Sequence, residues 1–464
     1  MAAEKTEAAV QAPRSLTAAY LTVALLAFAI ALMAWEARGR VPLLERLDHL
    51  SLDAQTQWRG RLAPATEHPL VLVALDDASL QRLGTFAPDR RLMAQAIDQL
   101  TAAEAKVIAL DILMPEPARP DPTSDAVLAQ AMRASGRVLI PFVLPGEAGS
   151  PNDPASSALR ASALTQHSGE AAQRYVALRP VRLIAPLDSL TAAAAGVGHV
   201  SEPRGADGSL RFDLPALTFD DEVYPSMALR IAALAADVAW PSVNVRFGRE
   251  LRLGAHHVPL DSFSRQWVNY YGPAGTIRTV SFVDVLDGKL PAGSLRGAVV
   301  IVGASALGAG NHFPSPFDAA LPGAERVATV VDNILSDRVL TRPTWGTAAE
   351  VLAMLALPLL AVALISARRL RSTVLSLALL AALALALALG LQALFIQHHQ
   401  VLSPAFPLAA LLLATLGASA VRSAAELAKE FKKSCKRSGC KRWASMWARA
   451  GSSTRRCRSR PPRR

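Results

Sequence analysis

Four stretches of this 464-residue chain are long and apolar enough to cross a lipid bilayer, which takes about 20 helical residues at about 1.5 Å each. They cover residues 16–35, 347–366, 372–396 and 401–421. The apolar core of the first stretch exceeds the roughly 7–15 residues of a signal peptide, so we expect it to remain as an anchor. An all-α membrane part is therefore predicted, with one helix before and three after a large middle segment.

The positions of Lys and Arg predict the orientation of these helices, because cytoplasmic flanks carry an excess of positive charge. Basic residues precede the first helix, fill the loop between the second and third, and follow the fourth. The loop between the third and fourth has none. This pattern predicts a cytoplasmic N-terminus (1–15), a segment outside the cytosol (36–346) and a basic cytoplasmic tail (422–464).

The formal net charge of +11 belongs to the tail. Residues 421–464 contain 15 Lys or Arg and two Glu, a net charge of +13 that leaves −2 for everything before them. The middle segment thus has no excess of positive charge that would bind nucleic acid, and we do not expect nucleic acid as a partner. All three cysteines also lie in the tail, so the middle segment must be stable through its core without disulfides.

Short apolar runs alternate with helical patterns in the middle segment, which predicts an α/β domain with a mixed, partly parallel sheet. Residues 145–180 are rich in Pro, Gly, Ser and Ala and predict a surface excursion. Strands are predicted at 70–75, 106–110, 137–143, 196–200, 210–214, 266–271 and 298–302, and helices at 92–100, 127–132, 224–235 and 323–335.

Carboxylates follow two of these predicted strands. Asp76 and Asp77, with Ser79 close behind, follow the first strand, and Asp111 follows the second. We expect the two strands to be neighbours, which would gather these side chains at the edge where parallel sheets bind ligands. Convergent carboxylates could hold a cation or act as acid and base. The alternative is that they cap helices and form turns.

The stretch 299–310, VVIVGASALGAG, resembles a nucleotide-binding loop but lacks the Gly-Lys-Ser/Thr and the G-x-G-x-x-G patterns. It predicts a strand exit, with a small-ligand loop as the alternative. Asn311 and His312 follow it, and Asp207 lies in an Asp-Gly turn, so all three join the candidate sensing residues. The histidines have no metal-ligand spacing, and neither a metal nor another cofactor is predicted.

Several stretches, in this order and spacing, resemble the type-2 CHASE domain, an extracytoplasmic sensory module of bacterial receptors. The resemblance covers roughly residues 40–421, and the layout of one helix before and three after is also that of the family. The matching stretches are LDDASLQRLG (75–84), VIALDILMPEP (107–117), GVGHV with ADGSLR (196–211), YPSMALRIAAL (224–234), VNYYGPAGTIRTVSFVDVLDGKLP (268–291), LRGAVVIVGASALGAGNHFPSPF (295–317) and LPGAERVATVVDNIL (321–335).

The resemblance implies a sensor that signals through its membrane helices to a cytoplasmic histidine kinase or adenylate or guanylate cyclase. Only 43 residues follow Val421, too few for such a domain, so we expect the output domain to be absent from this chain. Residues 85–90 and 327–329 depart from the Trp-Pro-Trp-Pro-Arg-like and His-Ala-Asn stretches common in the family, which predicts a different ligand or none.

The basic tail has two interpretations. Residues 432–464 could bind anionic lipid, with Trp443 and Trp447 at the membrane interface. Their Arg, Ser, Pro and Cys content is equally typical of out-of-frame translation of a GC-rich gene.

Three functional hypotheses follow. The first is a membrane sensor of an unknown small-molecule or ionic stimulus, without catalytic activity of its own and expected to form a homodimer. The second is an exported hydrolase that uses Asp76, Asp77 and Asp111 as a metal or acid/base cluster. The third is a membrane scaffold that dimerises through its Leu- and Ala-rich helices.

Overall fold

The computed structural model describes residues 3–38, 40–85, 87–145, 155–169, 182–202, 205, 207–308, 310–367 and 373–437, with side chains omitted at 3–15, 373, 432 and 435–437. Most of the predicted surface excursion over 145–180, the basic loop 368–372 and the tail beyond 437 lie outside this description.

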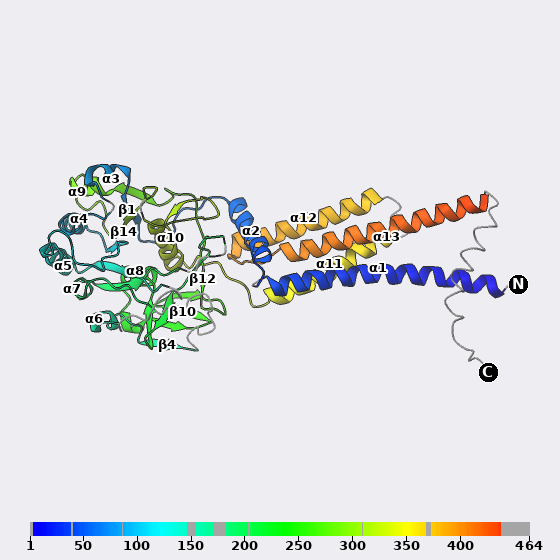
Figure 1. Ribbon diagram of the computed structural model, residues 1–464, viewed down its shortest axis with the longest axis horizontal. Coiled ribbons are helices and arrows are strands. Elements are labelled where there is room, and N and C mark those ends of the chain that lie inside the picture. Colours follow the sequence, from blue (N-terminus) through cyan, green and yellow to red (C-terminus); the bar gives the residue numbers. More distant parts are fainter. Residues whose placement is uncertain are drawn as a thin grey trace, which may run out of the picture. The chain divides into compact units, whose positions relative to one another are not determined.

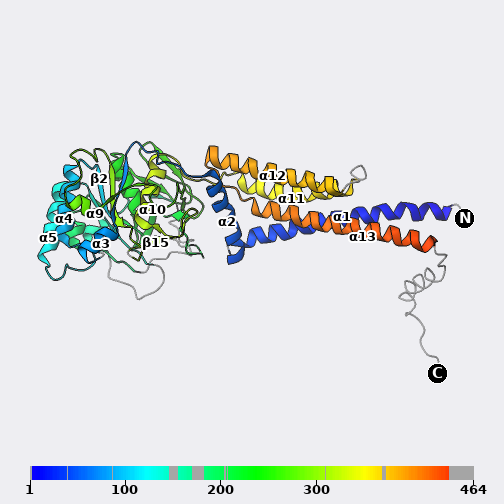
Figure 2. The ribbon, with the colours of Figure 1, turned by 90° about the horizontal axis from the view of Figure 1, so that it is seen from above.

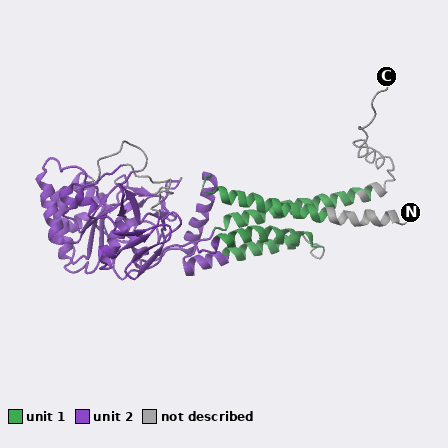
Figure 3. Ribbon diagram, turned by 90° about the horizontal axis from the view of Figure 1, so that it is seen from below, with its two compact units in different colours: residues 1–40, 347–388, 403–464 green, residues 41–346, 389–402 purple. Residues whose placement is uncertain are grey.

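The chain divides into two compact units, shown in different colours in Figure 3. Unit 1 comprises residues 1–40, 347–388 and 403–464. Unit 2 comprises residues 41–346 together with the short segment 389–402. The α/β unit therefore includes the last turns of the third long helix and the residues that directly follow it.

Four long helices account for the described part of unit 1. They are α1 (Ala3–Ala37), α11 (Gly346–Ser366), α12 (Thr373–His398) and α13 (Ala405–Arg437). Within them Leu16–Ala37, Gly346–Ser366, Val374–His398 and Ala405–Phe431 are long and apolar enough to cross a membrane. These four stretches correspond to the four windows predicted from the sequence.

Small residues hold the long helices together. Ala24 and Ala27 of α1 are buried in one cluster with Ala414 and Ala418 of α13. Small side chains let helix backbones approach closely where lipid removes the hydrophobic drive for association.

The centre of unit 2 is a six-stranded sheet in the order β13-β1-β14-β2-β3-β5. Every pairing in it is parallel. The strands are β1 (Leu70–Leu75), β2 (Val107–Leu110), β3 (Val138–Phe142), β5 (Gly196–His199), β13 (Arg278–Ser281) and β14 (Val299–Ala304).

The prediction that β1 and β2 are neighbours was wrong. β14, which comes from much later in the chain, lies between them and pairs with β1 on one side and β2 on the other. Both edges of Val299–Ala304 form hydrogen bonds with parallel strands. These strands are far away in the chain, so local sequence does not show which of them will pair.

The inner strands are apolar throughout because both faces of the sheet are covered. Alternate residues enter two separate cores: Val71 and Val73 face one, whereas Leu70 and Leu72 face the other. The first core packs against α4 (Arg90–Ala102), α5 (Thr123–Ser135) and α9 (Phe282–Leu286), which are grouped with α3 in Figure 2. The second packs against α8 (Met227–Ala235) and α10 (Gly323–Leu335), so unit 2 is a three-layer sandwich (Figure 1).

Smaller elements surround this sandwich. A four-stranded sheet has the order β11-β10-β9-β4, and three two-stranded ladders join β12 to β6, β15 to β16 and β7 to β8. The remaining helices are α2 (Pro42–Arg59), α3 (Asp77–Leu83), α6 (Ser157–Arg160), α7 (Asp188–Thr191) and the 3₁₀ turn η1 (Trp240–Ser242). The remaining strands are β4 (Gln166–Ser168), β6 (Phe212–Asp213), β7 (Ala216–Phe219), β8 (Glu222–Pro225), β9 (Asn244–Arg246), β10 (Glu250–Leu253), β11 (His256–Pro259), β12 (Gln266–Trp267), β15 (His312–Phe313) and β16 (Leu321–Pro322).

The α/β prediction with partly parallel pairing is confirmed, and in the described residues the parallel and antiparallel pairings fall mostly in separate sheets. One predicted strand, 266–271, is cut to its first two residues, β12. The reason is that Asn269 N donates to the Asn333 side chain at 2.8 Å, and Tyr271 O accepts from Leu62 N, so neither group is left to a neighbouring strand. The predicted helix 224–235 begins at Met227, because residues 224–225 end β8.

Candidate functional site

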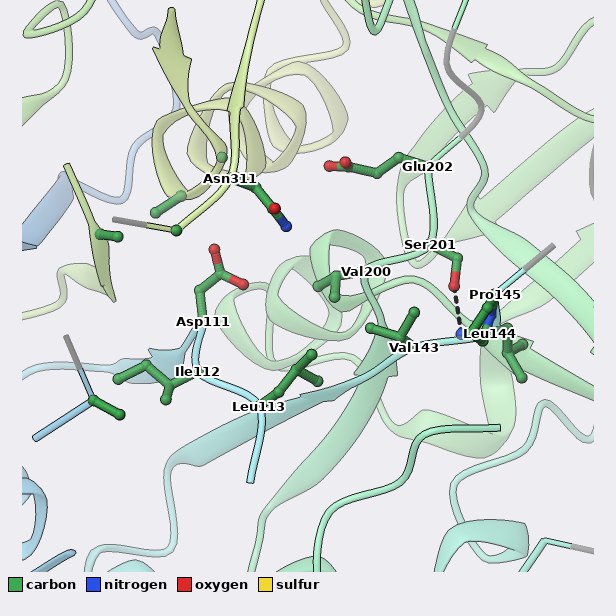
Figure 4. A pocket seen from close by; sticks show the side chains of 15 residues that line it. Asp111, Ile112, Leu113, Val143, Leu144, Pro145, Val200, Ser201, Glu202 and Asn311 are labelled. Carbon is green, nitrogen blue, oxygen red and sulfur yellow. Dashed lines mark hydrogen bonds between the residues drawn. The ribbon is translucent and has the colours of Figure 1, made fainter. Parts of the chain in front are cut away.

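A cavity of about 620 Å³ opens at the carboxyl edge of the parallel sheet (Figure 4). Its walls come from the residues that follow β2, β3 and β5, the end of β14 and the first turn of α10. Ligands of open α/β sheets bind outside the carboxyl ends of the strands, and the volume is within the range of small-molecule sites. This cavity is therefore the candidate site.

Asp111 is the acidic group of the cavity. It directly follows β2, and its carboxylate points into the open space in Figure 4. No hydrogen bond or ion pair satisfies this carboxylate in the described part of the chain. Burial raises the pKa of Asp111 to about 6, although the positive charge of Arg326 works in the opposite direction.

Asn311 faces Asp111 across the cavity, and the two side chains point toward one another (Figure 4). The loop is held by its backbone, since Gly323 N donates to Asn311 O at 2.8 Å. Like the carboxylate, the Asn311 amide makes no side-chain hydrogen bond with a described residue. The carboxylate and the amide are thus both available to a bound molecule.

Ser201 and Glu202 supply the polar groups on the β5 side. Ser201 Oγ accepts from Leu144 N at 2.7 Å, which fixes the loops after β3 and β5 to each other. Glu202 Oε1 accepts from Arg326 Nη1 at 3.0 Å. The Glu202 carboxylate is therefore held in place by a buried cation.

Arg326 lies near the start of α10, the helix that contributes Gly323 and Ala324 to the cavity, and is almost completely buried. It also donates from Nη2 to Phe212 O at 2.8 Å and to Asp213 Oδ1 at 3.1 Å. Burial alone would lower the pKa of Arg326, but the carboxylates of Glu202 and Asp213 raise it. One guanidinium thus pairs with two carboxylates, and its charge offsets the effect of burial on the pKa of Asp111 only in part.

His199 ends β5 close to this cluster. The ring is buried and packs edge-on against Phe142, and among the described residues neither ring nitrogen has a hydrogen-bond partner. Burial lowers the pKa of His199 to about 3, and the charge of Arg326 lowers it further, so the ring is neutral near pH 7.

Apolar side chains complete the cavity. They come from three different loops: Ile112, Leu113, Val143, Leu144 and Val200. A small molecule with an apolar body and a hydrogen-bond donor, preferably positively charged, fits these walls together with Asp111 and Asn311. The described residues include no group of three His, Cys, Asp or Glu placed to hold a metal ion.

The other strand-end candidates have structural partners. Asp76 caps α3: Oδ1 accepts from Ser79 N at 2.9 Å and Oγ at 2.6 Å, and from Ser281 Oγ at 2.9 Å. Burial opposes ionisation of Asp76, but these hydrogen bonds lower its pKa overall. Asp77 is exposed in the first turn of α3. Because β14 separates β1 from β2, none of Asp76, Asp77 and Ser79 is among the residues that line the cavity with Asp111.

Asp207 and His312 also lie outside the cavity lining. Asp207 pairs with Arg211 at 2.9 Å and accepts from Ser209 Oγ at 2.6 Å. Burial raises the pKa of Asp207, but these contacts outweigh it and lower the pKa to about 2. His312 Nε2 lies 3.4 Å from Ser305 O, and its ring is half-buried in β15.

The glycine-rich exit of β14 has a packing role. A Cβ on Gly303 would lie 2.6 Å from the Ala324 Cβ and 3.3 Å from the Asp111 Cβ, so only glycine lets α10 sit this close to the strand. Ala304 and Gly310 line the cavity. The strand-exit interpretation of this stretch therefore holds, and its exit contributes to the candidate ligand site.

Sequence reasoning missed Ser201, Glu202 and Arg326. The rule that selected Asp111, a polar residue directly after a buried strand, would also have selected Ser201 and Glu202. Arg326 interrupts an apolar helix face, and a lone cation in that position predicts a buried ion pair.

Comparison with known protein families supports the site's setting in a sensory domain. The family model of the CHASE2 domain matches residues 23–365, and CHASE2 domains are extracellular sensory domains. No curated protein and no solved structure shows significant similarity to the chain. The match covers well over half of the sequence, and the chain belongs to the CHASE2 domain family.

Proposed function

We propose that the chain is a sensory receptor of a bacterial inner membrane. Residues 36–346 face the periplasm, and both termini face the cytoplasm. The CHASE2 match, four helices able to cross a membrane and the distribution of Lys and Arg support this arrangement.

The stimulus in this proposal is a small organic molecule with a cationic hydrogen-bond donor, bound in the cavity at the sheet edge. The observation that carries it is the Asp111 carboxylate, which faces an open cavity without a partner in the described residues. An unpaired carboxylate in a partly dry site is unfavourable until a donor satisfies it. Asn311 would accept or donate a further hydrogen bond beside it.

Helix α10 would relay occupancy of the cavity. Its first residues, Gly323 and Ala324, line the cavity, and the whole helix is buried. Near its other end Asp332 accepts from Tyr271 Oη at 2.5 Å and from Thr66 N at 2.9 Å. A rigid, fully packed helix moves as one body, so a displacement at the cavity is transmitted along its length.

Beyond α10 the chain reaches the segment between the last two long helices. Thr341 N donates to His399 O at 2.8 Å, and Val401 N donates to Thr341 O at 2.8 Å. Trp267 and Leu340 form a further bridge beside this pair. The segment between α12 and α13 is therefore hydrogen-bonded to the segment that follows α10, which supports transmission of a shift along the chain to the membrane helices.

The output in this proposal belongs to a separate cytoplasmic kinase or cyclase, as the resemblance of the sequence implies, and the α/β unit itself has no catalytic role. A homodimer formed through the membrane helices would bring two output domains together. Signalling further requires that the ligand bind two conformations unequally.

The proposal is tested with the full chain in lipid nanodiscs. A thermal-shift screen of amines, amino acids, polyols, metal cations and nucleotides is repeated on Asp111→Asn and Asn311→Ala, with Asp77→Asn as an exposed control. We expect an organic amine to stabilise the parent and the control, and to lose at least tenfold in affinity in Asp111→Asn. Stabilisation only by nucleotides, or equal affinity in all variants, would overturn the cavity as the sensing site.

The relay is tested on the same samples by hydrogen exchange. The amides of Thr341 and Val401 should change their protection when the amine binds, and Asp111→Asn should abolish the change. Binding without any change at these two amides would leave the cavity as a ligand site but contradict the relay.

A further inference from the structure

Helix α2, Pro42–Arg59, exposes its apolar face and buries a largely polar one, the opposite of an ordinary surface helix. Leu43, Leu47, Leu50 and Trp58 are exposed to 67%, 46%, 61% and 58%. Their spacing of four, three and eight residues places them on one face. Soluble helices turn such a face toward the protein, whereas α2 turns it away.

The inward face of α2 is largely polar and makes specific contacts. Arg211 Nη2 donates to Asp53 Oδ2 at 2.7 Å, and Arg211 Nη1 lies 3.2 Å from His49 Nδ1. Gln55 and Thr56 are buried, and Thr56 Oγ1 donates to Leu52 O at 2.9 Å. These contacts fix the rotation of the helix, so the outward position of the leucines is built into the fold.

Two connections place α2 at the end of the membrane helices. The first candidate span ends at Ala37, and α2 starts at Pro42. Five residue steps reach at most about 18 Å, so the helix starts close to the bilayer surface.

The second connection is a set of contacts within unit 2. Gln392 Nε2 donates to Gln55 O at 3.0 Å, and Gln55 Nε2 donates to Leu402 O at 3.4 Å. Leu52 packs in one cluster with Phe395, which lies in the last turn of the span Val374–His398. The middle of α2 therefore contacts the end of α12, beside which it lies in Figure 2. If Val374–His398 crosses the bilayer, this contact puts α2 where that helix leaves it.

We propose that the exposed face of α2 lies in the lipid interface of the protein's own membrane. Leu43, Leu47 and Leu50 would enter the boundary between headgroups and acyl chains, and Trp58 would occupy the depth at which tryptophan is enriched. Arg46 is exposed on the same face and suits anionic headgroups. Lipid is present at this level without recruitment of another protein, so the apolar face is covered in every copy.

The consequence is that α2 couples the bilayer surface to the sensory unit. Arg211 joins α2 to Asp207, and Gln55 joins it to the segment between α12 and α13. A change in lipid packing or surface charge that moves α2 would act on both contacts. This property is independent of the cavity and of its ligand.

Site-directed spin labelling of the full chain tests the lipid contact. Cys435, Cys440 and Cys457 are replaced by Ser, and single labels are placed at Leu47→Cys or Leu50→Cys, with Leu307→Cys, an exposed loop position, as the control. The chain is reconstituted in nanodiscs of zwitterionic and anionic phospholipid. Accessibility is measured to oxygen, which concentrates in lipid, and to a water-soluble nickel chelate.

We expect labels at 47 and 50 to be accessible to oxygen and at least threefold less accessible to nickel than the label at 307. High nickel accessibility at 47 and 50 would show a water-exposed face and overturn the proposal. Spin–spin coupling that disappears on dilution with unlabelled chain, combined with low accessibility to both reagents, would show a second copy on this face and overturn it equally. Since all labels replace exposed side chains, an unchanged melting profile verifies that the fold is intact.

Discussion

Arg326 Nη1 donates a hydrogen bond to Glu202 Oε1 at 3.0 Å and thereby joins the first turns of α10 to the loop after β5. Both groups are largely excluded from water. Glu202 lines the cavity, and Arg326 belongs to α10, the helix that leads away from it. A ligand that disturbed Glu202 would act directly on α10, which makes this contact the first link of the proposed relay.

Arg326→Met should destabilise the sensory unit. Glu202 and Asp213 would lose their buried cation, and removal of one partner from a buried ion pair costs about 3–5 kcal/mol. Thermal unfolding of the full chain in nanodiscs should show a drop in Tm of several degrees. Arg82→Met, which breaks an exposed pair with Asp287, is the control and should change Tm little. Equal Tm values for the two variants would contradict the inferred role of Arg326.

Asp111→Asn should stabilise the ligand-free protein at neutral pH. Because burial raises the pKa of Asp111 to about 6 from its ordinary value of 3.8, the folded state binds a proton more tightly than the unfolded state. Its contribution therefore favours folding at low pH and is lost as the pH rises through about 6. The neutral amide avoids this loss, on the order of 3 kcal/mol.

The measurement is Tm against pH for the parent and for Asp111→Asn. The variant should be more stable at pH 7.5 and equal to the parent at pH 4. Binding of a cationic ligand to the parent should weaken below pH 6, since the carboxylate is then protonated. A variant that is less stable at every pH would mean that the Asp111 carboxylate has a structural partner.

His199→Leu should affect pH dependence in the opposite direction. The pKa of His199 is lowered to about 3 from 6.5, so the unfolded state binds the proton more tightly between these values. The parent must therefore lose stability as the pH falls from 6.5 toward 3, by about 1.4 kcal/mol per pH unit for this group.

With leucine at position 199 the loss of stability in acid should disappear. Stability at pH 7 should be preserved or raised, because neither ring nitrogen has a partner to lose in the described part of the chain. Tm measured at pH 7.5 and pH 4.5 gives the comparison. If His199→Leu lowers Tm at pH 7.5 by more than a few degrees, the ring makes an interaction that its buried position does not indicate.

Gly303→Ala should separate α10 from β14. The added methyl would lie 2.6 Å from the Ala324 Cβ, and such overpacking typically costs about 1–3 kcal/mol. The cavity would change shape as well, because Asp111 and Ala324 both line it. Ligand affinity should therefore fall together with Tm.

The matched control is Gly390→Ala, since no atom lies within 4 Å of a Cβ at that position in α12. This variant should keep both stability and ligand affinity. If only Gly390→Ala lost stability and ligand affinity, the packing of α12 would matter and the contact between β14 and α10 would not.

The apolar runs of the central sheet could be predicted from local sequence. Leu70–Leu75 and Val299–Ala304 are apolar without alternation because both faces of their sheet are covered, and that pattern is visible in a few consecutive letters. The candidate membrane helices were equally visible, because length and hydropathy suffice to identify them. Of the candidate site residues, Asp111 and Asn311 do line the cavity.

Which strand-end residues would come together at the cavity could not be predicted, because this depends on the order of the strands in the sheet. Asp76 and Asp111 both follow buried strands, but β14 separates those strands and leaves Asp76 to cap α3. Arg326 and Glu202 are 124 residues apart in the chain and meet only through the packing of α10 against the sheet.

The polarity of α2 shows the same division. The helical spacing of Leu43, Leu47 and Leu50 can be seen in the local sequence. Which face of the helix turns inward depends instead on the contacts that distant parts of the chain make with it. Arg211 and the segment 389–402 offer polar contacts and so bind the polar face. Sequence by itself determined the inner strands of the central sheet and the candidate membrane spans, because these depend on neighbouring residues. The cavity and the outward leucines were decided by tertiary structure, because they depend on contacts between residues far apart in the chain.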